Sequence, residues 1–234
     1  MKLFEEKFQN SRSTANSNLM ICVSISDCTA TECLKALAKV KAAEIRLETI
    51  SGIDEAAVKW IFGSKAKIVA TCRPGKMPYE KRKKLLLSAI RAGAAYVDIE
   101  VDAPDDYKKE IVEAASDAEC KVIVSFHDYE KTPVREELEQ IISWGFDSEA
   151  DMVKIACSVN SEQDSARLLG LLDKERKLIV VGMGEKGKIV RVVAPLLGSQ
   201  IAYASSGKGK ESASGQMTAE ELEKAIKAIR DAVE

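Results

Sequence analysis

Short apolar runs rich in Val and Ile alternate with longer amphipathic segments from residue 19 to the end of the chain. A continuous apolar run bounded by turn residues is typical of a strand that is covered on both faces, as in a parallel sheet. The pattern predicts eight strands, which cover residues 19–25, 44–49, 66–72, 95–100, 120–126, 151–156, 177–183 and 200–205.

The segments between these runs carry apolar side chains at the three- and four-residue spacing of a helix. The clearest examples cover residues 29–41, 79–92, 134–144 and 218–233. Residues that favour helix starts stand where the pattern needs them: Asp54 follows the second run, Pro133 lies at an expected first turn, and Thr218 precedes two glutamates. We expect about eight helices, one after each strand.

Strict alternation of strands and helices with short connections calls for parallel strands and right-handed crossovers. Eight β/α units in 234 residues predict an α/β fold, a (β/α)8 TIM barrel, as a single domain over residues 19–234. A doubly wound open sheet is the alternative, although it more often has about five to seven strands. Residues 1–18 are predicted to be a polar N-terminal extension, and the sequence leaves open whether it is ordered.

The charge balance excludes several classes of function. With 35 basic and 37 acidic side chains, the net charge is −2, whereas a nucleic-acid-binding protein usually carries a basic surplus. No apolar run reaches the roughly 18 residues of a membrane-spanning helix, and the N-terminus lacks the apolar region of a signal peptide. We therefore expect a cytoplasmic protein that binds neither nucleic acid nor membrane.

The cysteines and the single histidine argue against a metal centre. None of the six cysteines forms a Cys-x-x-Cys pair, and one histidine cannot complete a zinc set with them. Several lie inside apolar runs, where a cysteine behaves as a small buried hydrophobe. We expect reduced structural thiols and no bound metal.

Charged and polar side chains interrupt the apolar runs near the ends of five neighbouring strands. In a barrel, alternate side chains point into the lumen, and catalytic groups cluster at the C-terminal strand ends. The residues with lumen-facing parity are Glu44, Arg46, Glu48, Thr71, Arg73, Asp98, Glu100, Ser125, His127 and Lys154. Burying so many charges is costly, which favours an active site; a buried ion network without chemistry is the alternative.

Lys154 stands in an apolar core strand from which its side chain cannot easily reach water. Burial and nearby cations such as Arg46 or Arg191 favour the neutral amine. A neutral lysine amine in a closed pocket is the nucleophile of Schiff-base chemistry with a ketone or aldehyde. The alternative is a structural ion pair with Glu44 or Glu100.

His127 ends the strand next to that of Lys154 and is the only imidazole available for proton transfer. A strand-end histidine beside such a lysine is a candidate general acid/base, with Glu44 as a candidate partner that fixes its ring. Taken alone, the same histidine fits a hydrogen-bonded core residue.

Two glycine-rich segments need separate interpretation. Residues 182–188 match the spacing of a phosphate loop, but Ile189 follows where magnesium binding needs Ser or Thr, so we expect no nucleotide. Residues 205–216, rich in Gly, Ser and Lys, follow the last strand, where a barrel loop often closes over an anionic ligand group. We expect a mobile lid, with a disordered linker as the alternative.

Six motifs occur in order at consecutive strand ends: EIRLE (44–48), TCRP (71–74), SFHDYEKTP (125–133), MVKIA (152–156), GMGEKGKIVR (182–191) and SASGQ (212–216). Together, from about residue 19 to the C-terminus, they resemble the type I 3-dehydroquinate dehydratases, Schiff-base enzymes of the shikimate pathway. The resemblance implies dehydration of 3-dehydroquinate to 3-dehydroshikimate, a step in aromatic amino acid biosynthesis, without a cofactor. Homodimers are common in that family, although nothing in the sequence independently supports one.

The resemblance also assigns roles. It makes Lys154 the imine-forming lysine and His127 the general acid/base, with Glu44 acting on the substrate and the histidine. The residues that it implies in substrate binding are Ser24, Glu44, Arg46, Arg73, Arg191, Ser212 and Gln216, of which Ser24 is the weakest match. The stretch after Arg73 departs from the family, since it reads Pro-Gly-Lys-Met where many members carry Gly and Glu.

Two other functions stay open. A class I aldolase shares the barrel and a lysine on the sixth strand, but it usually binds a phosphorylated substrate and needs no arginine cluster around a histidine. A barrel-shaped binding protein without activity is the second, and the presence of both Lys154 and His127 argues against it.

Overall fold

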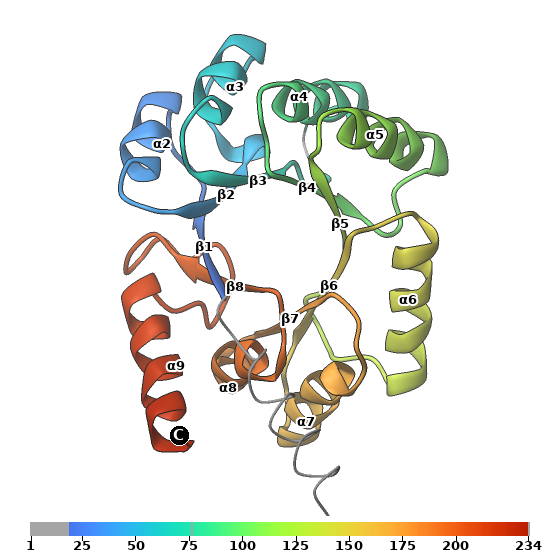
Figure 1. The fold of residues 1–234 in the computed structure, drawn as a ribbon, viewed down its shortest axis with the longest axis vertical. Helices are drawn as coiled ribbons and strands as arrows, with labels where there is room; N and C mark the ends of the chain where they lie inside the picture. The colour runs from blue at the N-terminus through green and yellow to red at the C-terminus, as the bar shows by residue number, and fades with distance from the viewer. Residues whose placement is uncertain (1–18, 76, 234) are drawn as a thin grey trace, which may run out of the picture.

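The computed structural model describes residues 19–75 and 77–233, so the predicted extension over residues 1–18 lies outside the described residues. Within them, eight parallel strands form a ring that is surrounded by helices (Figure 1). The strands are β1 (Met20–Ile25), β2 (Ala42–Arg46), β3 (Lys67–Thr71), β4 (Tyr96–Glu100), β5 (Lys121–Asp128), β6 (Met152–Ser158), β7 (Leu178–Met183) and β8 (Ile201–Ser205).

The helices follow the strands in regular alternation. They are α2 (Ala30–Leu37), α3 (Glu55–Phe62), α4 (Tyr79–Arg91), α5 (Asp105–Asp117), α6 (Arg135–Asp147), α7 (Glu162–Gly170), α8 (Lys188–Val193) and α9 (Ala219–Val233). Short 3₁₀ helices are η1 (Leu47–Thr49), η2 (Leu171–Asp173), η3 (Glu185–Gly187) and η4 (Ala194–Leu197). No helix in the described ranges is long and apolar enough to cross a membrane.

The strand order identifies the fold. Hydrogen-bonded neighbours run β7-β6-β5-β4-β3-β2-β1-β8, and all the pairs are parallel. The first and last strands of this series approach one another, since Gln200 N donates to Leu178 O at 2.9 Å. The sheet is therefore a nearly closed (β/α)8 barrel; this confirms the predicted fold, and the open doubly wound sheet was wrong.

Local sequence explains several element boundaries. Asp54 caps α3 as predicted, because its carboxylate accepts a hydrogen bond from Ala57 N at 2.8 Å. The predicted second strand is too long at its C-terminal end: the chain turns into η1 after Arg46, whose Nη2 pairs with Glu48 Oε1 at 2.6 Å. Glu48 therefore does not belong to a strand, although its parity matched the lumen-facing set.

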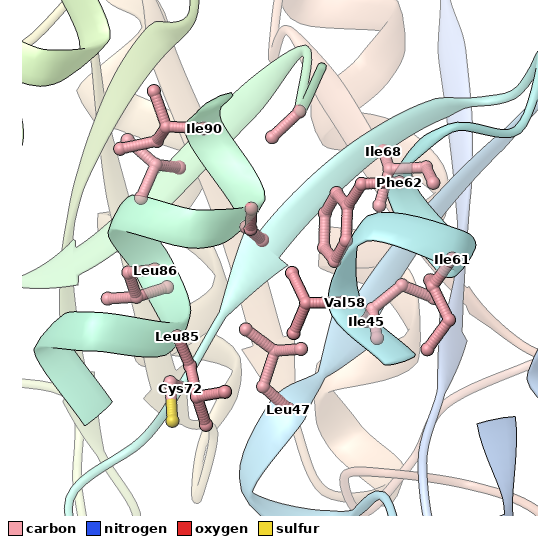
Figure 2. Packing of buried hydrophobic residues seen from close by; sticks show 14 of the residues in the cluster. Ile45, Leu47, Val58, Ile61, Phe62, Ile68, Cys72, Leu85, Leu86 and Ile90 are labelled. Carbon is pink, nitrogen blue, oxygen red and sulfur yellow. The ribbon is translucent and has the colours of Figure 1, made fainter. Parts of the chain in front are cut away.

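Two apolar layers hold the barrel together. Outside the ring, α3 and α4 pack on β2 and β3 through residues such as Phe62 and Leu86, both almost fully buried (Figure 2). Inside it, a separate cluster that includes Val69, Ile123 and Ile179 fills the lumen. Apolar side chains thus occupy the lower lumen, and the charged groups gather above them at the C-terminal strand ends.

Candidate active site

One small cavity, of about 50 Å³, opens at the C-terminal ends of the strands. Its lining contains all nine residues that the sequence assigned to catalysis or substrate binding: Ser24, Glu44, Arg46, Arg73, His127, Lys154, Arg191, Ser212 and Gln216. A larger groove of about 1110 Å³ lies outside the barrel between α2 and α9, and none of the nine is among its lining residues. The chemistry of the molecule is therefore concentrated in the smaller cavity.

Lys154 reaches into this cavity from β6 and is only 5% exposed. Its Nζ donates to Glu44 Oε1 at 3.4 Å and to Asp98 Oδ2 at 3.2 Å. The ion pair that the sequence left open therefore exists, with Asp98 in place of Glu100 as the second partner. An ion pair and a reactive amine are compatible, because the carboxylates hold the lysine where a ligand in the cavity would meet it.

Arg73 joins the carboxylates of β4 into one network. Its Nη1 donates to Asp98 Oδ1 at 3.0 Å, to Ser125 Oγ at 2.8 Å and, by a short contact, to Glu100 Oε1. Burial alone raises the pKa of the Asp98 carboxyl, but Arg73 and Lys154 hold it below its ordinary value. Asp98 is therefore charged, and Arg73 is engaged by protein acceptors as well as lining the cavity.

His127 has a different partner from the one that the sequence suggested. Its Nδ1 lies 3.2 Å from Glu100 Oε2, whereas Glu44 bonds to Ser24, Thr71 and Lys154. The reason is strand order: β4 and β5 are neighbours, with Glu100 opposite Ser125, while β2 lies elsewhere in the ring. The carboxylate favours the tautomer with a proton on Nδ1, which leaves Nε2 free to accept one.

The surroundings of His127 keep its ring neutral. Burial and, next to it, the Arg73 guanidinium lower the pKa of His127 below its ordinary value, and the hydrogen bond with Glu100 opposes that shift. A neutral imidazole near pH 7 is the form that can remove a proton from a ligand. The ring is therefore held in one orientation and in the form that can accept a proton.

Glu100→Gln tests that orientation. Because the carboxylate raises the pKa of His127, its loss should move the acid limb of the pH–rate profile to lower pH, and kcat should fall by at least about 10-fold as the ring loses its fixed tautomer. The measurement is kcat against pH, with Asp102→Asn, an exposed carboxylate on the following loop, as the control. An acid limb that moves to higher pH would contradict this account.

Arg191 is a buried cation that lacks an acidic partner in the described part of the chain. It lies on α8 and is 4% exposed; Nη2 donates to Ser214 O at 3.4 Å, and Nε has no hydrogen-bond partner among the described residues. Burial lowers the pKa of the Arg191 guanidinium to about 10. An unpaired buried guanidinium that lines a cavity is a receptor for a carboxylate or another anion.

The segment after β8 closes the cavity through a chain of hydrogen bonds. Gln216 Oε1 accepts from Ser212 N at 2.8 Å and from Ser212 Oγ at 3.2 Å, and Gln216 Nε2 donates to Ser24 Oγ at 3.2 Å. Ser24 Oγ in turn donates to Glu44 Oε2 at 3.3 Å. Part of the glycine-rich segment is thus tied to the partner of Lys154, as a lid over the site requires, and its mobility stays a prediction.

The phosphate-loop spacing has a packing explanation. A Cβ atom on Gly182 would lie 2.7 Å from Gly187 O, and a Cβ atom on Gly187 would lie 2.5 Å from Gly182 C. The two glycines allow η3 to pack against the end of β7, and their backbones leave no room for a phosphate between them. α8, which follows this loop directly, carries Arg191 into the cavity.

The cysteines are free thiols, in agreement with the sequence. Burial raises the pKa of all six, including the half-buried Cys28 and, most strongly, Cys22. The five buried thiols, Cys22, Cys33, Cys72, Cys120 and Cys157, are therefore unreactive packing residues. In the described ranges, no group of three or more His, Cys, Asp or Glu side chains is arranged to hold a metal ion.

Sequence reasoning missed two features of the site. Asp98 was placed in the lumen without a role and Glu100 only as an alternative partner of Lys154, whereas Asp98 holds Lys154 and Glu100 holds His127. Tyr203 of β8 was not singled out, because an aromatic residue in an apolar run fits a core position; its ring centroid lies 4.2 Å from Lys154 Nζ. Glu100 and His127 lie on consecutive strands, which are neighbours in a barrel, so the sequence could have identified Glu100 as the partner of His127. No sequence signal distinguishes Tyr203.

The fold and this cavity define a (β/α)8-barrel protein whose ionisable side chains converge on a lysine and a histidine at the C-terminal strand ends. The sequence profile of the type I 3-dehydroquinase family matches residues 21–232. The chain belongs to that family and is an enzyme, a lyase.

Curated relatives and solved structures agree with this family assignment. The chain is 31% identical to a 3-dehydroquinate dehydratase of Desulfotalea psychrophila over 86% of its length and 94% of the relative's. It is 38% identical to a 3-dehydroquinate dehydratase of Methanocaldococcus jannaschii, in a match that covers 61% of this chain and 64% of the relative. The crystal structure of the Aquifex aeolicus 3-dehydroquinate dehydratase is similar with a TM-score of 0.77 and 26% identity, covering 89% of this chain and 98% of that one. The Clostridium difficile type I enzyme, at 23% identity, shares the fold with a TM-score of 0.82, over 93% of this chain and 94% of that one.

Proposed function

We propose that the chain dehydrates 3-dehydroquinate to 3-dehydroshikimate through an imine on Lys154, with His127 as general acid/base. The observation that carries this proposal is the convergence of a buried lysine, an oriented neutral histidine and an unpaired buried arginine on one cavity. Membership of the type I 3-dehydroquinase family supports it.

The first step joins substrate and enzyme. The Lys154 nitrogen, having passed a proton on within the site, attacks the C3 ketone carbon and forms a carbinolamine. Loss of the former ketone oxygen as water then leaves an iminium ion. Written from the ammonium, the step balances without an external proton, since RNH₃⁺ and O=C give RNH⁺=C and water. The iminium withdraws electrons and makes the proton on C2 acidic.

The second step is elimination. His127 removes the C2 proton, and the electron pair of that bond moves toward the iminium nitrogen to give an enamine. The enamine then expels the C1 hydroxyl group, which takes the proton back from His127 and leaves as water. Hydrolysis of the conjugated iminium releases 3-dehydroshikimate and restores the lysine, so the net change is loss of one water molecule.

The remaining groups hold the substrate. Arg191 is the best placed to bind the substrate carboxylate through both arms of its guanidinium, because nothing acidic in the described chain competes for it. Glu44, Arg46, Ser212 and Gln216 would hold ring hydroxyls and close the site. Arg73 would act mainly by keeping Asp98 and Glu100 charged and in place.

Arg191→Met separates binding from folding. Without the cation, KM for 3-dehydroquinate should rise about 10- to 100-fold, since a charge-assisted bidentate contact is lost. The same change should raise the free energy of unfolding by on the order of 1–3 kcal/mol, because it removes a buried charge that lacks an acidic partner. Steady-state kinetics and thermal unfolding measure the two effects. The control is Arg135→Met, which breaks a pair with Asp173 outside the cavity. An unchanged KM for Arg191→Met would contradict the role of Arg191 in binding the substrate carboxylate.

The proposed function is tested by incubating the purified chain with 3-dehydroquinate and recording the ultraviolet absorbance of the conjugated product. We expect turnover that is insensitive to a metal chelator. A parallel assay with phosphorylated aldol substrates tests the class I aldolase that the sequence left open. No enone from 3-dehydroquinate, or cleavage of an aldol substrate instead, would overturn the proposal.

A further inference from the structure

Tyr203 projects from β8 into the lumen beside Lys154 and is a part of the cavity lining that neither the motifs nor the steps above employ. Its side chain is 5% exposed, and its ring centroid lies 4.2 Å from Lys154 Nζ. A cation over the face of an aromatic ring is attracted to it, so the ring helps to hold the lysine head group in place.

The hydroxyl group of Tyr203 is what needs an explanation. Its Oη is fully buried and, among the residues that the structure describes, has no hydrogen-bond partner. A buried hydroxyl without a partner is costly, and a phenylalanine would fill the same space and offer the same ring to Lys154. A buried donor that no described residue uses thus belongs to the tyrosine whose ring contacts the amine of Lys154.

We propose that Tyr203 is a catalytic residue of imine formation, whose hydroxyl donates a hydrogen bond to the oxygen of the substrate ketone as Lys154 attacks and to the carbinolamine hydroxyl that replaces it. This proposal rests on the proposed function. The oxygen on a carbon bonded to Nζ lies only two bonds from that nitrogen, and Nζ lies 4.2 Å from the Tyr203 ring centroid. The attacked ketone is proposed to turn that oxygen toward the Tyr203 hydroxyl.

The step is balanced without any change in Tyr203. The C–N bond forms from the nitrogen lone pair, the C=O π electrons move to oxygen, and that oxygen leaves as water with two protons from the lysine ammonium. Tyr203 stays protonated, since burial and the nearby Glu44 raise the pKa of its hydroxyl well above the ordinary value. It acts as a fixed donor toward developing negative charge on oxygen, as in an oxyanion hole.

The chain supplies a matched control. Tyr79 also has a buried hydroxyl without a hydrogen-bond partner in the described ranges, but it lines a neighbouring cavity with Arg82 and Tyr107 and not the cavity of Lys154. Tyr79→Phe removes a hydroxyl of the same kind from outside the site. Any general effect of removing a buried hydroxyl should therefore appear equally in both variants.

The experiment is rapid mixing with 3-dehydroquinate followed by a borohydride quench at increasing times, with the adduct measured by mass spectrometry. For Tyr203→Phe we expect adduct formation to slow by about 10- to 100-fold, up to the lower end of the roughly 10²–10³-fold loss seen when one oxyanion donor is removed. The adduct should still form on Lys154 at long times, and the rate of C2 deuterium exchange from the formed imine should be unchanged. Tyr79→Phe should match the wild-type chain.

Three results would overturn the proposal. A Tyr203→Phe variant that forms the adduct at the wild-type rate would show that the hydroxyl takes no part in the step. A variant that fails to fold would show that the hydroxyl has a structural task. Absence of an adduct in the wild-type chain would overturn the proposed function and this inference with it, whereas a normal wild-type adduct with an unaffected variant would overturn only the role of Tyr203.

Discussion

Replacing Lys154 with alanine is expected to reduce turnover of 3-dehydroquinate by on the order of 10⁴-fold or more, because no other amine in the described cavity lining can form the imine. The other cations that line the cavity are arginines, which do not serve as imine-forming nucleophiles. The measurement is kcat/KM from the ultraviolet signal of the product, together with the mass of the protein after borohydride treatment. We expect no adduct.

Lys154→Ala also leaves Glu44 and Asp98 without one of their cations. Breaking a buried ion pair in this way costs about 3–5 kcal/mol, so loss of activity alone would not separate chemistry from stability. Lys154→Arg keeps the positive charge and removes the nucleophile; it should fold and remain inactive. Lys121→Ala, at the exposed start of β5, is the control for loss of a lysine. Retained dehydratase activity in Lys154→Arg would count against the covalent route.

Replacing His127 with alanine is expected to lower kcat by about 10²–10⁴-fold while leaving imine formation intact. The ring is held by Glu100 and kept neutral by its surroundings, so its loss removes proton transfer at C2 and at the departing hydroxyl. Because His127 is the only histidine, no second imidazole can substitute for it. A borohydride-trapped adduct on Lys154 without product formation is the expected result.

Chemical rescue distinguishes a catalytic loss from a structural one. Imidazole added to His127→Ala should restore part of the turnover, since the small molecule can occupy the space of the lost ring. The pH dependence should follow the same reasoning: a base with a lowered pKa is active above that pKa, so the rate of the wild-type chain should fall only as the solution becomes acidic. Normal turnover in His127→Ala, or loss of the adduct together with turnover, would contradict the separate roles of the two residues.

Hydrophobic periodicity was sufficient to predict the barrel, because eight apolar runs alternating with helical segments allow few other arrangements. It was least accurate where a polar interaction, not burial, ends an element. β2 ends at Arg46, where the chain turns and Arg46 pairs with Glu48. The alternation of polar and apolar residues alone predicted that the strand continues to residue 49. A second boundary error is the end of α2 at Leu37, four residues before its predicted end.

The sequence predicted which residues line the site, but not which of them contact one another. Parity and the family resemblance together selected nine catalytic and substrate-binding residues, all of which line one cavity. Which carboxylate contacts which base depends on strand adjacency and register, and parity does not contain that information. Glu100 therefore replaced Glu44 as the partner of His127, and Asp98 joined Glu44 at Lys154. The buried hydroxyl of Tyr203 is visible only once its surroundings are known in three dimensions.

The central claim is that Lys154 becomes covalently bonded to the substrate. The most direct test is to reduce the chain with borohydride in the presence of 3-dehydroquinate, digest it and map the modified peptide by mass spectrometry. The account predicts one adduct on the peptide that contains Lys154, dependent on 3-dehydroquinate and absent from Lys154→Arg. An adduct on another lysine, or none while the product still accumulates, would contradict it.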